Sequence, residues 1–340
     1  MHLNIVKTND EFGALADEWN DLLKNSAIHV PFLRHEFLFT WWHTLGGGEW
    51  KHGELNVVVA RQEDGSLCGI APLFFTNNRE GEPALMLLGS IEISDYLDFI
   101  SPAEALQPFL TSLLQRLAEP DMPAWQVLDL YNLLEDSPTL PVLQSAVKKL
   151  GWSYTEDKLQ HCPYIPLPGD WETYLAGIDK KQRHEIRRKM RRVESADLPV
   201  RWYFVEDGSR LDAEIDDFLW LMEQDDEKKG FLTETMRTQM KNAAQAAFRE
   251  SWLQLAFIEI GGEKAAGYLN FDYANHIWVY NSGLSFTYGA YSPGWVLLGY
   301  LLQWANEHHR QAFDFMRGGE DYKYRFGAVD RFVVRACVRR

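Results

Sequence analysis

Apolar and polar positions change period several times along the chain, which predicts short strands and helices in alternation. In the first half, the pattern predicts a strand over 3–6 and helices over 10–24 and 32–45. Two β-branched runs over 55–76 flank a Glu-Asp-Gly-Ser turn, which is typical of a β-hairpin. The remaining elements predicted in this half are a strand over 94–100, a helix with Ser101 as N-cap and Pro102 as first residue, and a strand over 125–131.

The second half repeats this order of elements. A hairpin with a Gly-Gly turn over 253–274 leads into a strand over 276–284. Ser292-Pro293 then opens an apolar helix, and a strand over 312–316 closes the series. Recurrence of the same elements in the same order, at nearly constant separation, indicates a divergent duplication.

The repeated unit predicts the fold class and the domain organisation. A hairpin that leads into a strand–helix–strand crossover indicates an α/β (α+β) protein. We expect two tandem domains, each a mixed, mostly antiparallel sheet flanked by helices. Three prolines between 162 and 171 interrupt regular structure and mark the boundary. The expected domains are therefore 1–163 and 164–340.

Composition and charge narrow the class of protein. The 340 residues are 46% hydrophobic and 14% aromatic, which supplies packed cores and excludes a disordered chain. The formal net charge of −15 argues against general binding to nucleic acid or an anionic membrane, so any basic patch must be local. Three scattered cysteines, the polar N-terminus and the lack of an apolar run of about 18 residues predict a soluble, cytoplasmic protein without membrane insertion.

The order of elements resembles the GNAT acyltransferase fold, and several motifs resemble particular families. The closer resemblance is to the CelD-type (cellulose-biosynthesis) acetyltransferase-like family, with two such domains in tandem. It rests on PFLRHEFLFTWW, SDYLDFI, KKQRHEIRRKMRR, YSPGWVLL and DFMRGGEDYK. The segment YKYRFG is also similar to Fem-type aminoacyl-tRNA-dependent peptidyltransferases, in which an aromatic–lysine pair before Phe-Gly lies close to the reaction centre.

The resemblance implies acetyl-CoA or another acyl-CoA as donor, bound where the second apolar helix begins. Ser292, Pro293 and Gly294 are the expected donor-binding residues, because the amides and dipole of a helix N-terminus favour a phosphate. The chain departs from the GNAT pattern here, since FTYGAYSPGW lacks the Arg/Gln-x-x-Gly-x-Gly/Ala spacing. Glu104 in the matching helix of the first copy would repel a phosphate, so we expect the active site in the C-terminal domain.

Four residues near the C-terminus are candidates for catalysis: Lys323, Asp314, Tyr322 and Glu320. Acyl transfer needs positioning, a base for the nucleophile and stabilisation of an oxyanion. Lys323 would stabilise the oxyanion, or else pack on the tyrosines beside it. Asp314 would orient Lys323 or act as base, or else pair with a nearby arginine, Arg317 or Arg325.

The other two candidates also have a plain structural interpretation. Glu320 would act as a base, although acidic loop residues are often simply solvated. Tyr322 would return a proton to a leaving thiolate, or would be an aromatic residue at the edge of the core. No zinc-binding or other metal-binding motif is present, so no metal is expected.

Two further sets of residues are candidates for binding. The segment 180–192 is strongly basic, and Arg183 and Arg187 lie four residues apart on one helical face. This pair would bind a phosphate of CoA, of a nucleotide-sugar or of a tRNA end, or the segment would form a solvated face. Asp95 and Tyr96 would line a substrate cleft, or would be a buried polar pair that serves only the fold.

These expectations combine into one function with two alternatives. The expected protein transfers an acyl group, acetyl in the simplest case, from acyl-CoA directly to an amine or hydroxyl. The acceptor is a small molecule or a saccharide, and the family resemblance places it in exopolysaccharide or cell-envelope synthesis. The alternatives are a Fem-type transferase that uses aminoacyl-tRNA, and a non-catalytic accessory protein of polysaccharide synthesis. The sequence does not decide the acceptor or the oligomeric state.

Overall fold

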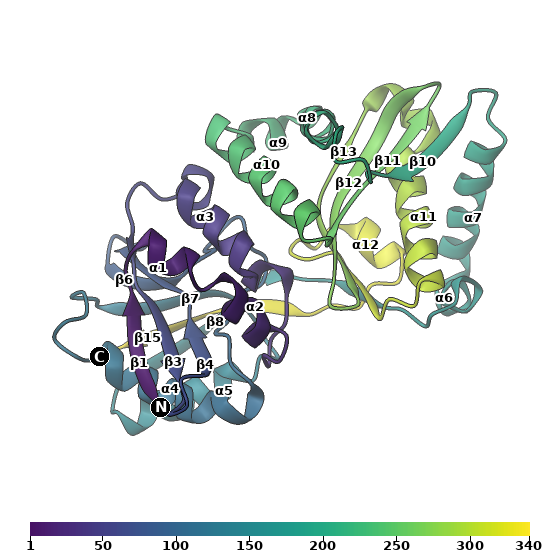
Figure 1. Ribbon diagram of the computed structural model, residues 1–340. Coiled ribbons are helices and arrows are strands. Elements are labelled where there is room, and N and C mark those ends of the chain that lie inside the picture. The colour runs from purple at the N-terminus through teal and green to yellow at the C-terminus, as the bar shows by residue number, and fades with distance from the viewer. The chain divides into compact units, whose positions relative to one another are not determined.

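The computed structural model describes residues 1–340, which form two compact units. Unit 1 comprises Met1–Gln160 and Phe332–Arg340, and unit 2 comprises His161–Arg331. The chain passes from unit 1 to unit 2 close to the expected boundary. The last strand differs from the expectation, because it returns to unit 1 and pairs there (Figure 1).

Unit 1 contains two sheets. The smaller is antiparallel, with the order β1-β3-β4, and the larger has the order β2-β5-β6-β7-β15-β8. In the larger sheet only β6 and β7 are shown to pair in parallel, while β15 pairs antiparallel with β7. The strands are β1 (His2–Val6), β2 (Glu54–Leu55), β3 (Val57–Arg61), β4 (Leu67–Ala71), β5 (Leu73–Asn77), β6 (Pro83–Leu87), β7 (Val127–Leu134), β8 (Ser153–His161) and β15 (Phe332–Arg339).

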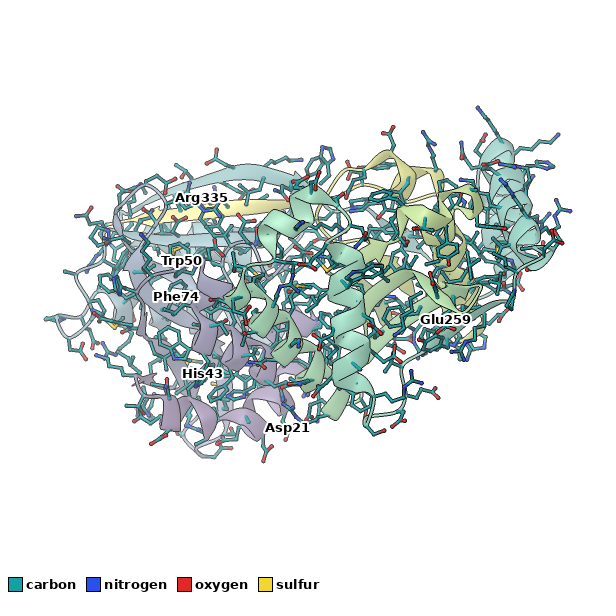
Figure 2. All side chains as sticks on the ribbon, turned by 90° about the horizontal axis from the view of Figure 1, so that it is seen from above. Asp21, His43, Trp50, Phe74, Glu259 and Arg335 are labelled. Atoms are coloured by element: carbon teal, nitrogen blue, oxygen red, sulfur yellow. The ribbon has the colours of Figure 1, made fainter.

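Helices of unit 1 bury aromatic side chains against these sheets. The rings of Trp41 and Trp50 lie 5.1 and 5.6 Å from the ring of Phe74 on β5, and Figure 2 labels Trp50 and Phe74 in this core. All three residues are buried, so they anchor the N-terminal helices to the larger sheet. The helices are α1 (Asn9–Gly13), α2 (Ala16–Leu23), η1 (Pro31–Leu33), α3 (His35–Gly48), α4 (Ala103–Leu117) and α5 (Thr139–Lys149).

Unit 2 is built on one six-stranded sheet with the order β10-β11-β12-β13-β14-β9. All neighbours are antiparallel except β13 and β14, which pair in parallel over three residues and end at Trp278 opposite Asp314. β13 therefore continues beyond the end of β14. The strands are β9 (Tyr164–Pro166), β10 (Val200–Phe204), β11 (Leu253–Ile260), β12 (Glu263–Tyr273), β13 (His276–Leu284) and β14 (Ala312–Asp314).

Helices cover both faces of this sheet (Figure 1). On one face α8 packs on β12 and β13 and α10 packs on β11, while on the other α11 packs on the same strands and on α6 and α7. The apolar side of α11 joins the core cluster of unit 2. The helices are α6 (Trp171–Gly177), α7 (Lys180–Glu194), α8 (Leu211–Met222), α9 (Asp226–Phe231), α10 (Glu234–Arg249), η2 (Phe286–Tyr291), α11 (Pro293–Glu307) and α12 (Asp321–Arg325). None of the helices combines the length and apolarity needed to cross a lipid bilayer.

Most predicted elements of the second half are confirmed. The Gly-Gly hairpin is β11–β12, the strand over 276–284 is β13, and Pro293 is the first residue of α11. The basic segment is the helix α7. No element was predicted between 200 and 249, where the structure has β10 and the helices α8, α9 and α10.

The strand predicted over 94–100 is wrong. This segment is an irregular loop with a single bridge, between Ile70 and Ile100, and β6 occupies the place beside β7. The buried Asp98 carboxylate accepts hydrogen bonds at 2.5 Å from the hydroxyls of Ser137 and Thr139, so the loop is organised around a polar group. The helix predicted after this segment, with Pro102 as its first residue, begins one residue later, because α4 starts at Ala103.

The two copies share chemistry as well as topology. A buried aspartate on the strand after the crossover helix pairs with an arginine in each unit: Asp129 with Arg335, and Asp314 with Arg331. Removing one partner of such a pair leaves a buried charge, so both pairs tie the C-terminal segment into the fold. This correspondence agrees with the duplication inferred from the sequence.

Candidate functional site

A cavity of about 270 Å³ lies in unit 2, beside the first turn of α11. It forms where β13 has passed the end of β14, so that the sheet no longer fills the space in front of α11. The three expected donor-binding residues, Ser292, Pro293 and Gly294, all line it. The complete lining is Tyr268, Ser282, Leu284, Gly289, Ser292, Pro293, Gly294, Trp295, Leu298 and Tyr322.

The start of α11 leaves the backbone amides of Gly294 and Trp295 without a capping side chain, and both residues line the cavity. Ser292 is the N-cap in a left-handed conformation (φ 53°, ψ 52°), Pro293 follows, and no side chain caps the helix. The first-turn amides of an uncapped helix have no partner within the helix, and its dipole adds partial positive charge. The cavity therefore combines an apolar wall with one end suited to a negatively charged or carbonyl oxygen.

Two tyrosines, Tyr268 and Tyr322, line the cavity. Tyr268 on β12 donates to the main-chain oxygen of Gly294 at 3.4 Å, and Tyr322 lies on α12. Burial raises the pKa of both phenols, and the nearby Glu320 carboxylate raises the pKa of each further. Both side chains therefore stay protonated near neutral pH and act as proton or hydrogen-bond donors.

Lys323 follows the lining residue Tyr322 but does not itself line the cavity. The side chain is buried, and its Nζ donates to the main-chain oxygens of Phe315, Arg317 and Gly318 at 3.2, 3.1 and 2.9 Å. Nζ also lies 2.9 Å from a carboxylate oxygen of Glu320. These contacts fold the loop between β14 and α12 around the ammonium, and so fix where Tyr322 lies.

Asp314 and Glu320 differ in how available their carboxylates are. Asp314 is buried, accepts from the amide of Met316 at 2.7 Å and pairs with Arg331. Arg331 was not among the arginine partners foreseen for Asp314, which were Arg317 and Arg325. Glu320 has its side chain 58% exposed while it pairs with Lys323, and its charge acts on both cavity tyrosines. Of the two carboxylates, Glu320 is the one within reach of a substrate.

The pair of arginines chosen from the sequence on the basic helix α7 makes its contacts away from the cavity. Arg183 donates to the main-chain oxygens of Leu175 and Ala176 at the end of α6, both at 3.3 Å, and Arg187 pairs with Glu172. Neither arginine lines the cavity. Lys189 is the cation of α7 that does approach it, since its Nζ lies 4.2 Å from the ring centroid of the cavity residue Trp295.

Asp95 and Tyr96 belong to unit 1, away from the strand position expected for them. Tyr96 is completely buried and packs its ring at 6.3 Å against Phe32. Asp95 precedes it in the same irregular loop and is half-buried. Tyr96 is therefore a core residue of unit 1, as in the structural alternative considered for it.

Several residues of the site were not identified from the sequence. Tyr268 and Ser282 line the cavity from neighbouring strands, and Lys228 on α9 donates to the main-chain oxygen of Ser282. The available signal was weak, because it consists of one glycine beside each lining residue. Gly267 is crowded by the rings of Phe257 on β11 and Phe218 on α8, and Gly283 is crowded by the end of α8. Nowhere do three or more His, Cys, Asp or Glu side chains gather so as to hold a metal ion.

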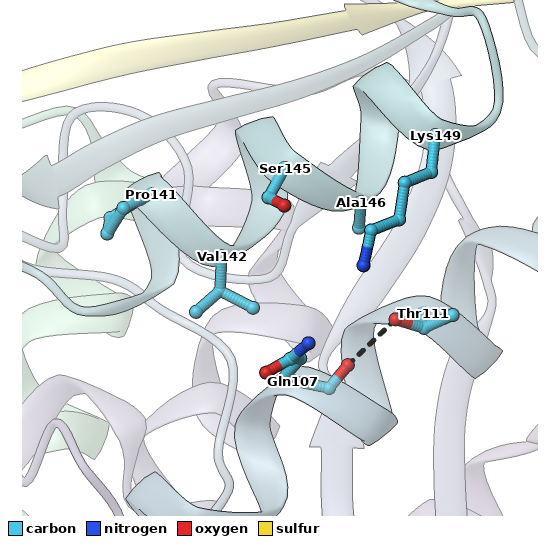
Figure 3. A pocket seen from close by; sticks show the side chains of 7 residues that line it. All are labelled: Gln107, Thr111, Pro141, Val142, Ser145, Ala146 and Lys149. Atoms are coloured by element: carbon cyan, nitrogen blue, oxygen red, sulfur yellow. Dashed lines mark hydrogen bonds between the residues drawn. The ribbon is translucent and has the colours of Figure 1, made fainter.

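Unit 1 has a groove of about 230 Å³ between α4 and α5 (Figure 3). Lys149 is its one charged side chain, and the hydrogen bond drawn there, from Thr111 to the main-chain oxygen of Gln107 at 2.9 Å, lies within α4. No group of acids, bases or nucleophiles converges on it. The unit 2 cavity is the better candidate for chemistry.

Comparison with known families agrees with this assignment. Residues 180–324, which contain the entire cavity lining, match the family model described as acetyltransferase (GNAT) domain. This segment is therefore similar to a GNAT acetyltransferase domain, and it spans less than half of the chain. The cavity thus lies within the segment that matches the GNAT model, beside the strands β12 and β13 and the helix α11.

Solved structures extend the likeness to both units. FemX matches with a TM-score of 0.65 at 13% identity, over 99% of this chain and 97% of that chain. L-PGS from Bacillus licheniformis matches with a TM-score of 0.58 at 14% identity, over 94% of this chain and 90% of that chain. The C-terminal domain of a putative lysylphosphatidylglycerol synthetase from Agrobacterium fabrum matches with a TM-score of 0.57 at 11% identity. The match covers 97% of this chain and 92% of that chain. At these identities the likeness concerns the fold. Among curated proteins, no match to the sequence is found.

Proposed function

We propose that this protein transfers an acyl group from an acyl thioester, acetyl-CoA in the simplest case, directly to an amine or hydroxyl acceptor. The observation that carries the proposal is the cavity of the GNAT domain, which opens on the uncapped first turn of α11. Its apolar wall suits an acyl chain, and the helix N-terminus suits the oxygens of the donor.

The proposed reaction uses the groups that surround the cavity. The acceptor nitrogen or oxygen attacks the thioester carbonyl, the new C–N or C–O bond forms, and the C–S bond breaks. Glu320 takes the proton of the acceptor, since it is the exposed carboxylate beside the cavity. Tyr322 returns a proton to the departing thiolate, because its raised pKa keeps the phenol protonated.

Lys323 and Asp314 have supporting roles in this proposal. Lys323 holds the loop that carries Glu320 and Tyr322, through its three bonds to main-chain oxygens. Asp314 holds the start of the same loop through the amide of Met316 and through Arg331. We expect both residues to act by positioning, with the positive charge of Lys323 adding to the field at the cavity.

We propose a polar acceptor for this reaction. The CelD-type resemblance suggests a saccharide of exopolysaccharide or cell-envelope synthesis. The exposed position of Glu320 fits a polar acceptor that enters from solvent.

Calorimetric titration with acetyl-CoA tests the donor. A Cβ on Gly294 would lie 3.7 Å from the nearest atom, a methyl group of Leu284, so Gly294→Leu fills the cavity without a clash at Cβ. Gly177→Leu is the matched control, because a Cβ there has no atom within 4 Å and Gly177 lies outside the cavity. We expect micromolar binding to the wild type, at least about tenfold weaker binding to Gly294→Leu, and no change in Gly177→Leu. Equal binding to all three proteins, or none to the wild type, contradicts the proposal.

A second candidate is a Fem-type transfer from aminoacyl-tRNA. Its support is the YKYRFG segment, the likeness to FemX over both units and the exposed cations of α7. Binding of tRNA through these cations would weaken steeply with salt, since each phosphate contact releases counterions. A tRNA affinity that stays constant between about 50 and 200 mM salt would exclude this mode of docking.

A further inference from the structure

Lys228 places its side-chain nitrogen against the wall of the acyl cavity. It lies on the six-residue helix α9, which has no buried residue, yet the lysine itself is half-buried. Its Nζ is 2.5 Å from the main-chain oxygen of Ser282 and 3.1 Å from Oδ1 of Asn281. Ser282 lines the cavity, so this nitrogen contacts a residue that borders the space assigned to the acyl group.

The surroundings of Lys228 differ from those of Lys323 in the number of acceptors. Lys323 has four acceptors, three main-chain oxygens and a carboxylate, which are enough to engage all three hydrogens of an ammonium. Lys228 has two acceptors, Ser282 and Asn281. A neutral amine has two hydrogens and one lone pair, so these two bonds leave the lone pair of neutral Lys228 unengaged.

The charges that face Lys228 come from its own helix and from the α12 region. Burial, the largest effect, lowers the pKa of Lys228, and the charge of Lys323 lowers it further. Asp225, Glu320 and Glu227 act in the opposite direction. The net shift is downward, which enlarges the neutral, nucleophilic fraction of this amine at a given pH.

We propose that Lys228 is an acylation site of this protein, which accepts an acyl group from a thioester bound in the cavity. The lone pair of Nζ attacks the thioester carbonyl, an amide C–N bond forms and the C–S bond breaks. The thiol leaves with the proton lost from nitrogen. The inference rests on the proposed function for the location of the donor, and goes beyond it because the acceptor is a side chain of the protein.

Acylation would change the cavity wall in two ways. The amide is uncharged, so a positive charge is lost beside Glu320 and Lys323. An amide nitrogen also carries a single hydrogen, so one of the bonds to Ser282 and Asn281 must break. The attached acyl group then lies next to Ser282 and narrows the cavity, which would slow binding of the next donor.

Peptide mass spectrometry of the purified protein tests the site. The protein is incubated with acetyl-CoA or with p-nitrophenyl acetate, a small ester that needs no nucleotide-binding site. The rate of acetylation is followed at each lysine. Lys229 is the internal control, because it is the next residue in the chain and is exposed. We expect Lys228 to react at least about tenfold faster than Lys229 in the folded protein, and equally fast in urea.

The outcomes separate this inference from the proposed function. Gly294→Leu should reduce labelling of Lys228 by acetyl-CoA, whereas Gly177→Leu, outside the cavity, should leave it unchanged. Binding of acetyl-CoA without faster labelling of Lys228 than of Lys229 by either reagent overturns the acylation site and leaves the donor assignment standing. Selective labelling by the ester, with no binding of acetyl-CoA, supports a reactive Lys228 and overturns acetyl-CoA as the donor.

Discussion

A Cβ atom on Gly283 would lie 2.6 Å from the backbone nitrogen of Met222. The end of α8 therefore approaches β13 so closely that only glycine fits. Side chains alternate along a strand, so this contact on one face fixes Ser282 on the other, toward the cavity. The packing of α8 thus determines the shape of the site without contributing a residue to it.

Gly283→Ala should destabilise unit 2 and disturb the cavity. The new methyl group meets backbone atoms of Leu221 and Met222, which cannot rotate away, so α8 must move. We expect a loss of about 1–3 kcal/mol in the free energy of unfolding. Gly230→Ala is the control, since a Cβ there has no atom within 4 Å. Urea unfolding of both variants measures the difference. Equal stability of the two variants would show that α8 moves away from the new methyl group at little cost in free energy.

Asp98 should make the stability of unit 1 depend on pH. Burial raises the pKa of this carboxyl from 3.8 to about 6, against the hydrogen bonds from Ser137, Thr139 and the amide of Phe99. The folded state therefore binds the proton more tightly than the unfolded chain. Its contribution to the free energy of unfolding falls as pH rises from about 4 to about 6, by at most about 3 kcal/mol.

Asp98→Asn isolates this effect from all other titrating groups. The amide keeps an oxygen that accepts a hydrogen bond and does not ionise. The stability of the Asp98→Asn variant relative to wild type should rise between pH 4 and pH 7, measured by urea unfolding at each pH. A constant difference across this range would mean that Asp98 keeps an ordinary pKa in the folded protein.

The sequence was most informative where local signals were strong. The Gly-Gly hairpin, the strand β13 and the Ser-Pro start of α11 were predicted because turn residues and apolar alternation mark them directly. The same local signal identified Ser292, Pro293 and Gly294 in the cavity lining. The segment 94–100 misled because its alternation of apolar and polar residues reflects a loop around a buried carboxylate.

Features that depend on distant pairing could not be predicted. The cavity lies where β13 extends past the last residue of β14. The pairing register of these two strands is not encoded in either strand alone. Lys228 reaches the site from α9, in the part of the chain where no element was predicted. In α7, the sequence identified a basic helix but not which face packs on α11, so Arg183 and Arg187 were chosen although Lys189 approaches the cavity.

Lys189→Ala should weaken donor binding more than Arg187→Ala does. Lys189 lies over the ring of Trp295, which lines the cavity, whereas Arg187 is turned toward Glu172 on α6. A partly exposed charge contact with a phosphate contributes at most about 1 kcal/mol, or about fivefold in affinity. Titration with acetyl-CoA at low salt compares the two variants. A larger loss of affinity in Arg187→Ala would instead indicate that the phosphate binds at Arg183 and Arg187, as first expected from the sequence.

Lys323→Met should destabilise the loop between β14 and α12. Methionine nearly matches lysine in length but donates no hydrogen bond, so the oxygens of Phe315, Arg317 and Gly318 lose their shared donor. We expect a loss of about 1–3 kcal/mol in the free energy of unfolding, together with reduced donor binding because Tyr322 is no longer held. Lys229→Met, at an exposed lysine, should change stability by less than about 0.5 kcal/mol.

Comparing the stability of Lys323→Met with that of the wild type also separates a positioning role for Lys323 from a purely catalytic one. A lysine that only stabilised an oxyanion would leave the unfolding free energy unchanged on substitution and lower only the rate of transfer. A lysine that holds the loop lowers stability even when no substrate is present. Hydrogen exchange adds a local readout, because the amides of Lys323 and Phe326 bond within this segment and should exchange faster in Lys323→Met. Unchanged exchange and unchanged stability in that variant would assign Lys323 to the reaction instead.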